Sequence, residues 1–219
     1  MSKPDPIRVD IISDVVCPWC IVGFLQLTKA AKATATELEV HWHPFELNPQ
    51  MPAEGQNLRE HMMEKYGSTR EESDKARAQL SQIGTDLGFS FNFGDESRMV
   101  NTFQVHQLLH WADDFGRGHE LKMALFAAYF TDGLNLHDPE VLLRVVQTLG
   151  MDVDAARLTL ENPETAKAVR AKQQFWLQQG IQGVPAMVFK QRHLVTGAQG
   201  EENYSNILTK LKELQEEDA

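Results

Sequence analysis

The only two cysteines of this 219-residue chain stand three positions apart, where an apolar segment passes into a helical pattern. Apolar side chains alternate over residues 7–12, which is typical of a β-strand, and residues 21–28 repeat them at helical spacing. Proline suits the first turn of a helix, because the N–H group that it lacks would have no partner there. A strand that turns into a helix at a cysteine pair constrains the fold more than any other feature. The segment is Cys17, Pro18, Trp19 and Cys20.

A cysteine pair in this setting suits thiol–disulfide exchange. Cys17 falls at the N-cap of the expected helix, where free backbone N–H groups and the helix dipole stabilise a negative charge. We therefore expect Cys17 to ionise at neutral pH more readily than a free cysteine. Cys20 lies one turn further along the helix and is expected to be more buried and protonated. These positions predict that Cys17 attacks a disulfide and that Cys20 resolves the mixed disulfide.

A purely structural role suits the cysteine pair less well than a redox role. A structural zinc site would need two further ligands, and His41 and His43 lie on a predicted strand instead of the usual helix. We therefore expect no metal. A structural disulfide across two residues would close too small a loop to stabilise much. Two unrelated buried cysteines are the remaining alternative for the pair taken alone.

Residues 1–50 predict a strand, a helix and a second strand. Leu38, Val40 and Trp42 alternate with polar residues, which indicates a strand after the helix. This order favours a parallel pair of strands joined by a right-handed crossover. Strand patterns return at residues 186–189 and 193–195, and a helical pattern follows them. The two ends of the chain therefore predict an α/β domain.

The middle of the chain has a mainly helical pattern. One helix is predicted to begin at Pro139, with Asp138 as its N-cap. Another is predicted to begin at Pro163 and to run to about residue 179. The economical architecture is one α/β domain interrupted by a helical insertion. Its predicted parts are residues 1–50 and 165–219 for the α/β domain and residues 51–164 for the insertion.

A second informative segment leads into the late strand. Pro185 is expected at the first position of this strand, where a missing N–H group is tolerated. A trans bond before it is the default, since about 5–6% of such bonds are cis. A cis bond would present the backbone N–H and C=O groups of Val184 to an extended substrate beside Cys17.

The charge balance disfavours some partners. The chain has 21 basic and 31 acidic residues and a net charge of −10, whereas nucleic acids and anionic membranes bind positively charged surfaces. The first residues lack the apolar core of a secretory signal, and no apolar run approaches the roughly 20 residues that span a bilayer. These features predict a cytoplasmic protein, in which a lone cysteine pair is more often catalytic than structural.

The sequence resembles the DsbA-like thioredoxin superfamily and, within it, the FrnE-type subfamily of dithiol–disulfide oxidoreductases and isomerases. The matching segments occur in order and extend over nearly the whole chain, which makes the resemblance more specific than a cysteine pair alone. They are residues 13–20, 44–49, 101–103, His106, and residues 129–133, 183–185 and 197–199.

The resemblance implies a thioredoxin fold with a large α-helical insertion. It also implies that Cys17 is the nucleophile, that Cys20 is the resolving cysteine and that Pro185 is a cis-proline. The substrate would be a disulfide or a dithiol, in a protein or in a small molecule. The substrate-binding residues that follow from the resemblance are Pro18, Trp19, Val184 and Pro185.

Four further positions follow from the resemblance. It implies that Asn101 and His106, from the insertion, lie near the cysteines, although packing within a helix would explain His106 equally well. Ile21 and Ala186 stand where aromatic residues are common in relatives. These two departures affect the expected substrate groove and leave the redox chemistry intact.

A neighbouring branch of the superfamily offers an alternative function. Kappa-class glutathione transferases and 2-hydroxychromene-2-carboxylate isomerases similarly combine this fold with a helical insertion, but typically carry serine where Cys17 stands and use glutathione. A glutathione-dependent isomerase or transferase is therefore the second hypothesis, and a binding protein without redox activity is the third. The leading hypothesis is a thiol–disulfide oxidoreductase that requires no cofactor and for which glutathione is a candidate redox partner.

Several properties stay open from the sequence. The direction of exchange, and so the choice between oxidase, isomerase and reductase, depends on a reduction potential that the motif does not fix. The sequence contains no glycine-rich phosphate-binding motif, so we expect no bound nucleotide. The large aromatic residues are most simply core residues, which leaves a homodimer open.

Overall fold

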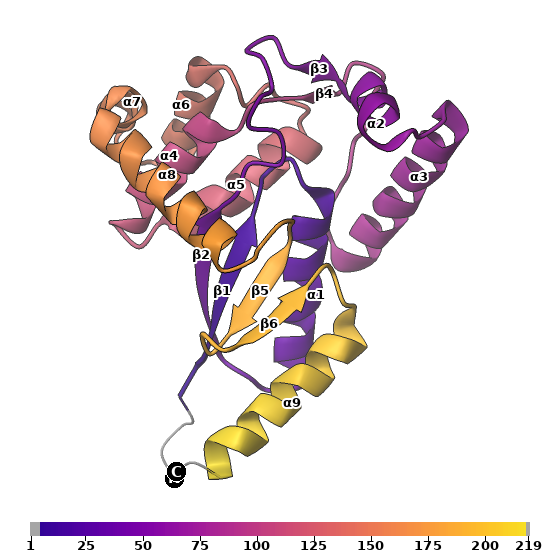
Figure 1. Ribbon diagram of the computed structural model, residues 1–219, viewed down its shortest axis with the longest axis vertical. Coiled ribbons are helices and arrows are strands. Elements are labelled where there is room, and N and C mark those ends of the chain that lie inside the picture. Colours follow the sequence, from indigo (N-terminus) through magenta and orange to yellow (C-terminus); the bar gives the residue numbers. More distant parts are fainter. Residues whose placement is uncertain (1–4, 218–219) are drawn as a thin grey trace.

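The computed structural model describes residues 5–217 and shows a mixed α/β protein with a helical insertion (Figure 1). Its central sheet has the strand order β2-β1-β5-β6. β1 and β2 run parallel, as predicted, whereas β5 is antiparallel to β1 and β6 is antiparallel to β5. The strands are β1 (Ile7–Ser13), β2 (Leu38–Pro44), β5 (Ala186–Phe189) and β6 (His193–Thr196).

Helices cover the sheet on both faces. α1 (Pro18–Ala33) connects β1 to β2 and packs beside α9 (Glu201–Glu217) on one face (Figure 1). α8 (Pro163–Gln178) contacts β2. Ile11 of β1 belongs to the main core, whereas Ile12 packs in a second cluster with Trp176 of α8. Because neighbouring residues of a strand point to opposite faces, β1 is buried on both sides and holds the residues after it in a fixed place.

The insertion lies between β2 and α8 and is mainly helical, as its pattern predicts. It also contains a two-stranded antiparallel ribbon, β3 with β4, that the sequence pattern did not predict. Each strand of this ribbon has two residues, which is too short for an alternating pattern to appear. The elements are β3 (Gln56–Asn57), α2 (Leu58–Tyr66), α3 (Arg70–Leu87), β4 (Arg98–Met99), α4 (Phe103–Asp113), α5 (Gly118–Phe130), α6 (Pro139–Thr148) and α7 (Val153–Glu161).

The predicted helix starts of the middle segment are confirmed. Asp138 caps α6 by accepting a hydrogen bond from the backbone N–H of Glu140, and Pro139 is its first residue. α8 begins at Pro163 and ends at Gln178. The predicted domain boundary after residue 164 therefore falls in the first turn of α8. Within residues 5–217, no helix combines the length and the apolar character needed to cross a membrane.

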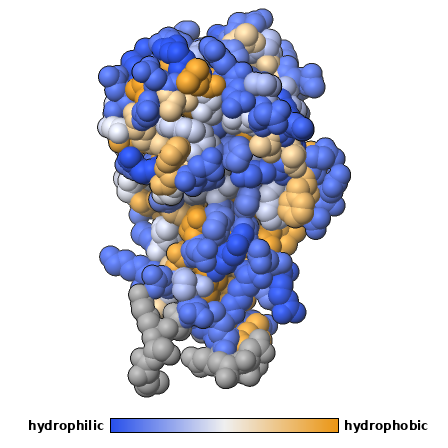
Figure 2. All heavy atoms as spheres, turned by 90° about the vertical axis from the view of Figure 1, so that its left-hand side faces the viewer, coloured by the Kyte–Doolittle hydropathy of each residue, from blue (hydrophilic) through white to orange (hydrophobic). Residues whose placement is uncertain are grey.

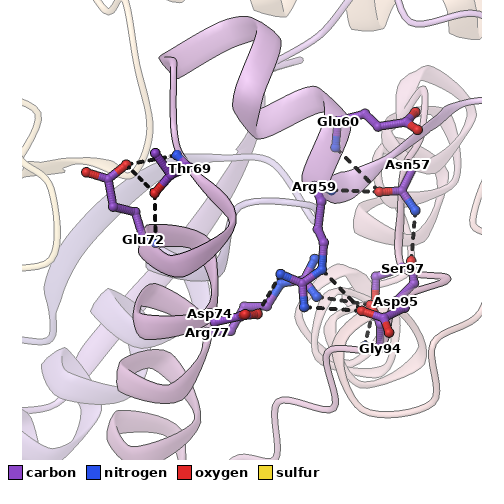
Figure 3. Close-up of polar contacts among 10 residues, drawn as sticks. All are labelled: Asn57, Arg59, Glu60, Thr69, Glu72, Asp74, Arg77, Gly94, Asp95 and Ser97. Carbon is purple, nitrogen blue, oxygen red and sulfur yellow. Dashed lines mark hydrogen bonds and ion pairs between the residues drawn. The ribbon is translucent and has the colours of Figure 1, made fainter.

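Polar contacts fix the first helices of the insertion. Asn57 caps α2, and Thr69 and Glu72 form a capping box at the start of α3 (Figure 3). Arg59 of α2 pairs with Asp74 of α3 at 2.5 Å. α3 also packs against α1. This part of the insertion is thereby attached to the helix that begins at the cysteine pair.

The surface on the side of α7 and α8 is mainly hydrophilic. Figure 2 shows this side, where hydrophobic residues appear as scattered patches between hydrophilic ones. That distribution agrees with a sequence in which 24% of the residues are charged, an ordinary share for a globular protein. The apolar side chains of the chain are instead gathered in the core between the sheet, α1, α9 and the insertion.

Candidate active site

Cys17 lies at the N-cap of α1, as the position of Pro18 predicts. Its backbone is extended, with φ −92° and ψ 109°, and Pro18 takes the first helical position. The Cys17 sulfur lies 3.6 Å from the backbone oxygen of Val184. The first N–H groups of a helix lack partners within the helix and attract negative charge. The Cys17 sulfur thus lies at the positive end of the α1 dipole.

Both cysteines are free thiols, and Cys20 is the more deeply buried. Cys17 is 4% exposed, whereas Cys20 has no exposed surface. Burial, together with the hydrogen bond and the charge of Cys17, raises the pKa of the Cys20 thiol well above its usual value. Cys20 is thus protonated at neutral pH, as expected for the second cysteine of the pair. The two thiols thus differ in how far they are buried.

The peptide bond between Val184 and Pro185 is cis, as the resemblance implies. Pro185 is buried at the start of β5, and its carbonyl oxygen accepts a hydrogen bond from the N–H of Gly197 at 2.8 Å. An open hollow of about 350 Å³ lies along residues 180–185 and the facing end of β6. Val184 therefore lines this hollow and also has its backbone oxygen next to the Cys17 sulfur.

Trp19 is the exposed member of the motif. Its side chain is 41% exposed, while the cysteines on either side are buried. Pro18 is partly exposed. An aromatic ring at the surface of a redox site offers apolar contact to a substrate. Pro18 and Trp19 are thus the more accessible members of the motif.

Asp14 precedes Cys17 by three residues and is fully buried, and its backbone oxygen accepts a hydrogen bond from the N–H of Cys17 at 3.2 Å. Its carboxylate accepts a hydrogen bond from the backbone N–H of Leu47 at 2.8 Å and lies 3.5 Å from Nε2 of His106. Burial alone would raise the pKa of Asp14, but His106, the Leu47 N–H group and Lys122 outweigh burial and hold that pKa below its usual value. The carboxylate is therefore a fixed negative charge in the segment directly before the cysteine pair.

His106 and Asn101 have different positions relative to this site. Nε2 of His106 lies 2.8 Å from the carbonyl oxygen of Phe45. A carbonyl oxygen only accepts, so this nitrogen carries the hydrogen, which also faces Asp14. Asn101 accepts a hydrogen bond from the N–H of Phe103 and donates one to Met51. Among the described residues, neither side chain has a hydrogen bond to a cysteine, and His106 reaches the pair only through Asp14.

Lys122 is the residue of this site that sequence reasoning missed. It lies in α5, is 1% exposed, and interacts electrostatically with Cys20, Asp14 and Cys17. The signal for it was a lysine inside an apolar helical segment, directly after Leu121. A charged residue on the buried side of such a helix is uncommon unless it has a partner or a function.

The order of the strands, the cysteine pair and the facing cis-proline define a thioredoxin-fold protein with a helical insertion. A family model, the DSBA-like thioredoxin domain, matches residues 8–209, and the chain belongs to this family. Members of this family are disulfide oxidoreductases and isomerases.

Three individual proteins are similar to this chain over most of its length. The crystal structure of the probable DsbA oxidoreductase SCO1869 from Streptomyces coelicolor is 32% identical, with a TM-score of 0.87, and the match covers 93% of this chain and 89% of that chain. The uncharacterized protein YwbO of Bacillus subtilis is 24% identical over 93% of this chain and 96% of its own length. The cytosolic disulfide reductase DsbM from Pseudomonas aeruginosa, solved with GSH, is 18% identical with a TM-score of 0.64, covering 94% of this chain and 99% of that chain. At that identity, the likeness to DsbM concerns the fold alone.

Proposed function

We propose that this protein is a thiol–disulfide oxidoreductase of the FrnE type, in which Cys17 attacks and Cys20 resolves. The observation that carries this proposal is the position of the Cys17 sulfur at the start of α1, 3.6 Å from the Val184 oxygen. A substrate that lies along the hollow at residues 180–185 would reach this sulfur before that of Cys20. Pro18 and Trp19 would contact the same substrate from the other side.

The reaction proceeds through a mixed disulfide. The thiolate of Cys17 attacks a substrate disulfide R–S–S–R′, forms a bond to one sulfur and releases R′S⁻, which takes up a proton from solvent. Cys20 then attacks the Cys17 sulfur and loses its proton, and the departing RS⁻ is protonated. The substrate gains two electrons and the protein loses them as the Cys17–Cys20 disulfide forms. The reverse sequence oxidises a substrate dithiol.

The backbone at Val184 would orient the substrate. Val184 is partly exposed and precedes the buried Pro185. A peptide-like substrate in extended conformation could pair with its backbone groups as a neighbouring strand does. Glutathione has such a backbone and is the redox partner that we propose. A structural relative with GSH, described as cytosolic, is compatible with this partner and with a cytoplasmic location.

Two cysteine variants test the proposal. We expect Cys17→Ser to abolish disulfide exchange, because serine does not supply a nucleophilic thiolate. Cys20→Ser should instead accumulate mixed disulfides, since Cys17 still attacks but nothing releases the adduct. Turnover with a glutathione-coupled disulfide assay and mass spectrometry of trapped adducts measure both effects. Each variant serves as the control for the other, because both remove one thiol from the same buried pair.

The outcome also separates the proposed function from the alternative. A glutathione-dependent isomerase or transferase would use Cys17 in place of serine and would keep its activity in Cys20→Ser. Full activity of that variant without trapped adducts would overturn the proposed roles. The direction of exchange follows from the reduction potential, where a value near −120 mV indicates a disulfide donor and one near −270 mV a reductase. A homodimer is a separate prediction, which sedimentation analysis would test.

A further inference from the structure

Lys122 is a buried charge without a direct polar partner. Its ammonium group lies 5.3 Å from the centre of the Trp42 ring and 5.1 Å from that of Phe126. In the part of the chain that the structure describes, no hydrogen bond or ion pair involves this group. Contacts with ring faces attract a cation but replace only part of its lost hydration. The position of Lys122 therefore requires another source of stabilisation.

Lys122 lies beside the buried carboxylate that precedes the cysteine pair: it shares its cavity with His106, whose Nε2 atom is 3.5 Å from Asp14. Burial lowers the pKa of Lys122 to about 8, while Cys20, Asp14 and Cys17 act in the opposite direction and support the ammonium form. The interaction is reciprocal. Burial raises the pKa of Cys20, and Lys122 acts against that effect. At neutral pH, the charged form of Lys122 predominates.

The surroundings of Lys122 hold further titratable groups from β2, α4 and α8. Lys122 lines a cavity of about 10 Å³, roughly the space of one water molecule, with residues of these elements. Burial raises the pKa of Asp113 on this cavity, and the charge of Asp113 supports the ammonium form of Lys122 less than Cys20, Asp14 and Cys17 do. The charged and titratable groups that face Lys122 or share its cavity are Cys17, Cys20, Asp14, His43, His106, His110, Asp113 and Lys172.

We propose that Lys122 is a positioning residue through which the helical insertion stabilises the thiolate state of the Cys17–Cys20 pair. The inference rests on the disulfide exchange proposed above. When Cys20 resolves the mixed disulfide, negative charge must develop on a sulfur with no exposed surface. Burial opposes this charge, and Lys122 is the lysine whose charge acts on Cys20 in its favour. α5 thus supplies the cation that the resolving step needs.

The charge of Lys122 should shift the equilibrium between the reduced cysteines and their disulfide. A cation beside the cysteine pair stabilises the reduced protein whenever one thiol is ionised. The disulfide form has no thiolate, so the cation does not stabilise it in this way. Lys122 therefore makes the cysteine pair easier to reduce. Without its charge, the equilibrium with glutathione should move toward the Cys17–Cys20 disulfide.

The test replaces Lys122 by a neutral side chain of similar length. We expect Lys122→Met to shift the equilibrium constant with glutathione about tenfold toward the protein disulfide, or roughly 30 mV for two electrons. The ultraviolet absorbance of the thiolate should also appear at higher pH in this variant. Lys122→Arg, which keeps the charge, should restore both properties in part. Lys172→Met is the matched control, because Lys172 lines the same cavity but is not among the main charges acting on Cys20.

The outcomes distinguish this inference from the proposed function. A wild-type protein whose cysteines do not cycle with glutathione would contradict the function itself. Normal cycling of the wild type together with an unchanged equilibrium in Lys122→Met would overturn the role of Lys122 alone. If the variant does not fold, nuclear magnetic resonance of labelled lysine in the wild type decides. A buried lysine titrating near pH 8 should move to higher pH upon reduction, and equal titration in both redox states would contradict the inference.

Discussion

Asp14 is a fully buried carboxylate three positions before Cys17, and its neighbours keep it ionised. The N–H group of Leu47 and the ring of His106 approach it from two different segments. One of its oxygens, Oδ1, has no hydrogen-bond partner among the described residues. The carboxylate therefore depends on its neighbours: the hydrogen bond of the Leu47 N–H group, the adjacent His106 ring and the charge of Lys122 all lower its pKa.

Asp14→Asn should weaken the protein most where the carboxylate is ionised. The pKa of Asp14 in the folded protein is below its unfolded value, so its contribution to stability is present above about pH 4 and is lost as the pH falls through the lowered folded-state pKa. We expect the free energy of unfolding at neutral pH to fall by about 1–3 kcal/mol. Urea unfolding at several pH values measures the difference, which should shrink in acid.

The exposed Asp132 provides the control for this prediction. Asp132→Asn should change the free energy of unfolding by no more than about 0.5 kcal/mol. A stability difference between wild type and Asp14→Asn that stays constant from neutral to acidic pH would show that Asp14 is not ionised in the folded protein.

The residues of the site differ in how far the sequence predicts them. Cys17 at the N-cap follows from Pro18, because proline marks the first turn of a helix. The inward orientation of Asp14 does not follow from any local pattern, since it depends on His106 and Leu47, which are distant in sequence. Lys122 was missed for the same reason: its partners come from α1, β2 and the segment before α1.

At the scale of elements, α3 links the insertion to the helix of the cysteine pair. The capping box of Thr69 and Glu72 satisfies the first backbone groups of α3 from both directions (Figure 3). α3 has few buried residues and packs on α1. Local capping therefore matters more for α3 than for helices with a large buried face.

Thr69→Ala should destabilise α3. The change removes the oxygen that accepts a hydrogen bond from the N–H of Glu72 at 3.2 Å, and loss of such a cap costs about 1 kcal/mol. Urea unfolding at neutral pH measures the loss. Ser68→Ala is the matched control next to it, because Ser68 lies outside the capping box, and it should cost less than about 0.5 kcal/mol. Equal stability of the two variants would argue against the capping box.

The sequence predicted α6 from its local signals. α6 has an aspartate cap, a proline at its first position and a glycine after its end, and the structure has all three. β3 and β4 lack any such signal, because they form only by pairing of residues 56–57 with 98–99. Short pairings of this kind are set by tertiary packing, which a single segment does not encode.

At the scale of the whole molecule, the segment after β2 joins the sheet to the insertion. The carbonyl oxygen of Phe45 binds His106 of α4. The next residue, Glu46, is nearly buried and pairs with Arg170 of α8, 124 positions later in the chain. The guanidinium of Arg170 lies 3.8 Å from the centre of the Phe103 ring at the start of α4. Two consecutive residues thus attach two helices to the end of one strand.

Glu46→Gln should loosen this attachment without altering the chemistry of the cysteines. The variant keeps the shape of the side chain but loses the charge that faces Arg170. Because the Arg170 side chain is 51% exposed, solvent weakens the pair, and we expect a loss of about 1–2 kcal/mol in the free energy of unfolding. Glu46 is not among the main charges acting on Cys20, so the equilibrium with glutathione should stay within about twofold of wild type.

Two measurements distinguish the mechanical attachment of the insertion to the sheet from the effect of the Lys122 charge on the cysteines. They are the free energy of unfolding, compared with a control variant, and the redox equilibrium with glutathione. Glu140→Gln removes an exposed ion pair with Arg157 and should cost no more than about 0.5 kcal/mol. Urea unfolding and glutathione titration are then compared for both variants and for Lys122→Met. A redox shift in Glu46→Gln as large as in Lys122→Met would mean that any loosening of the insertion alters the cysteines. A stability loss without a redox shift would instead show that the insertion acts on the pair through the charge of Lys122, and that its attachment by Glu46 is a separate, structural property.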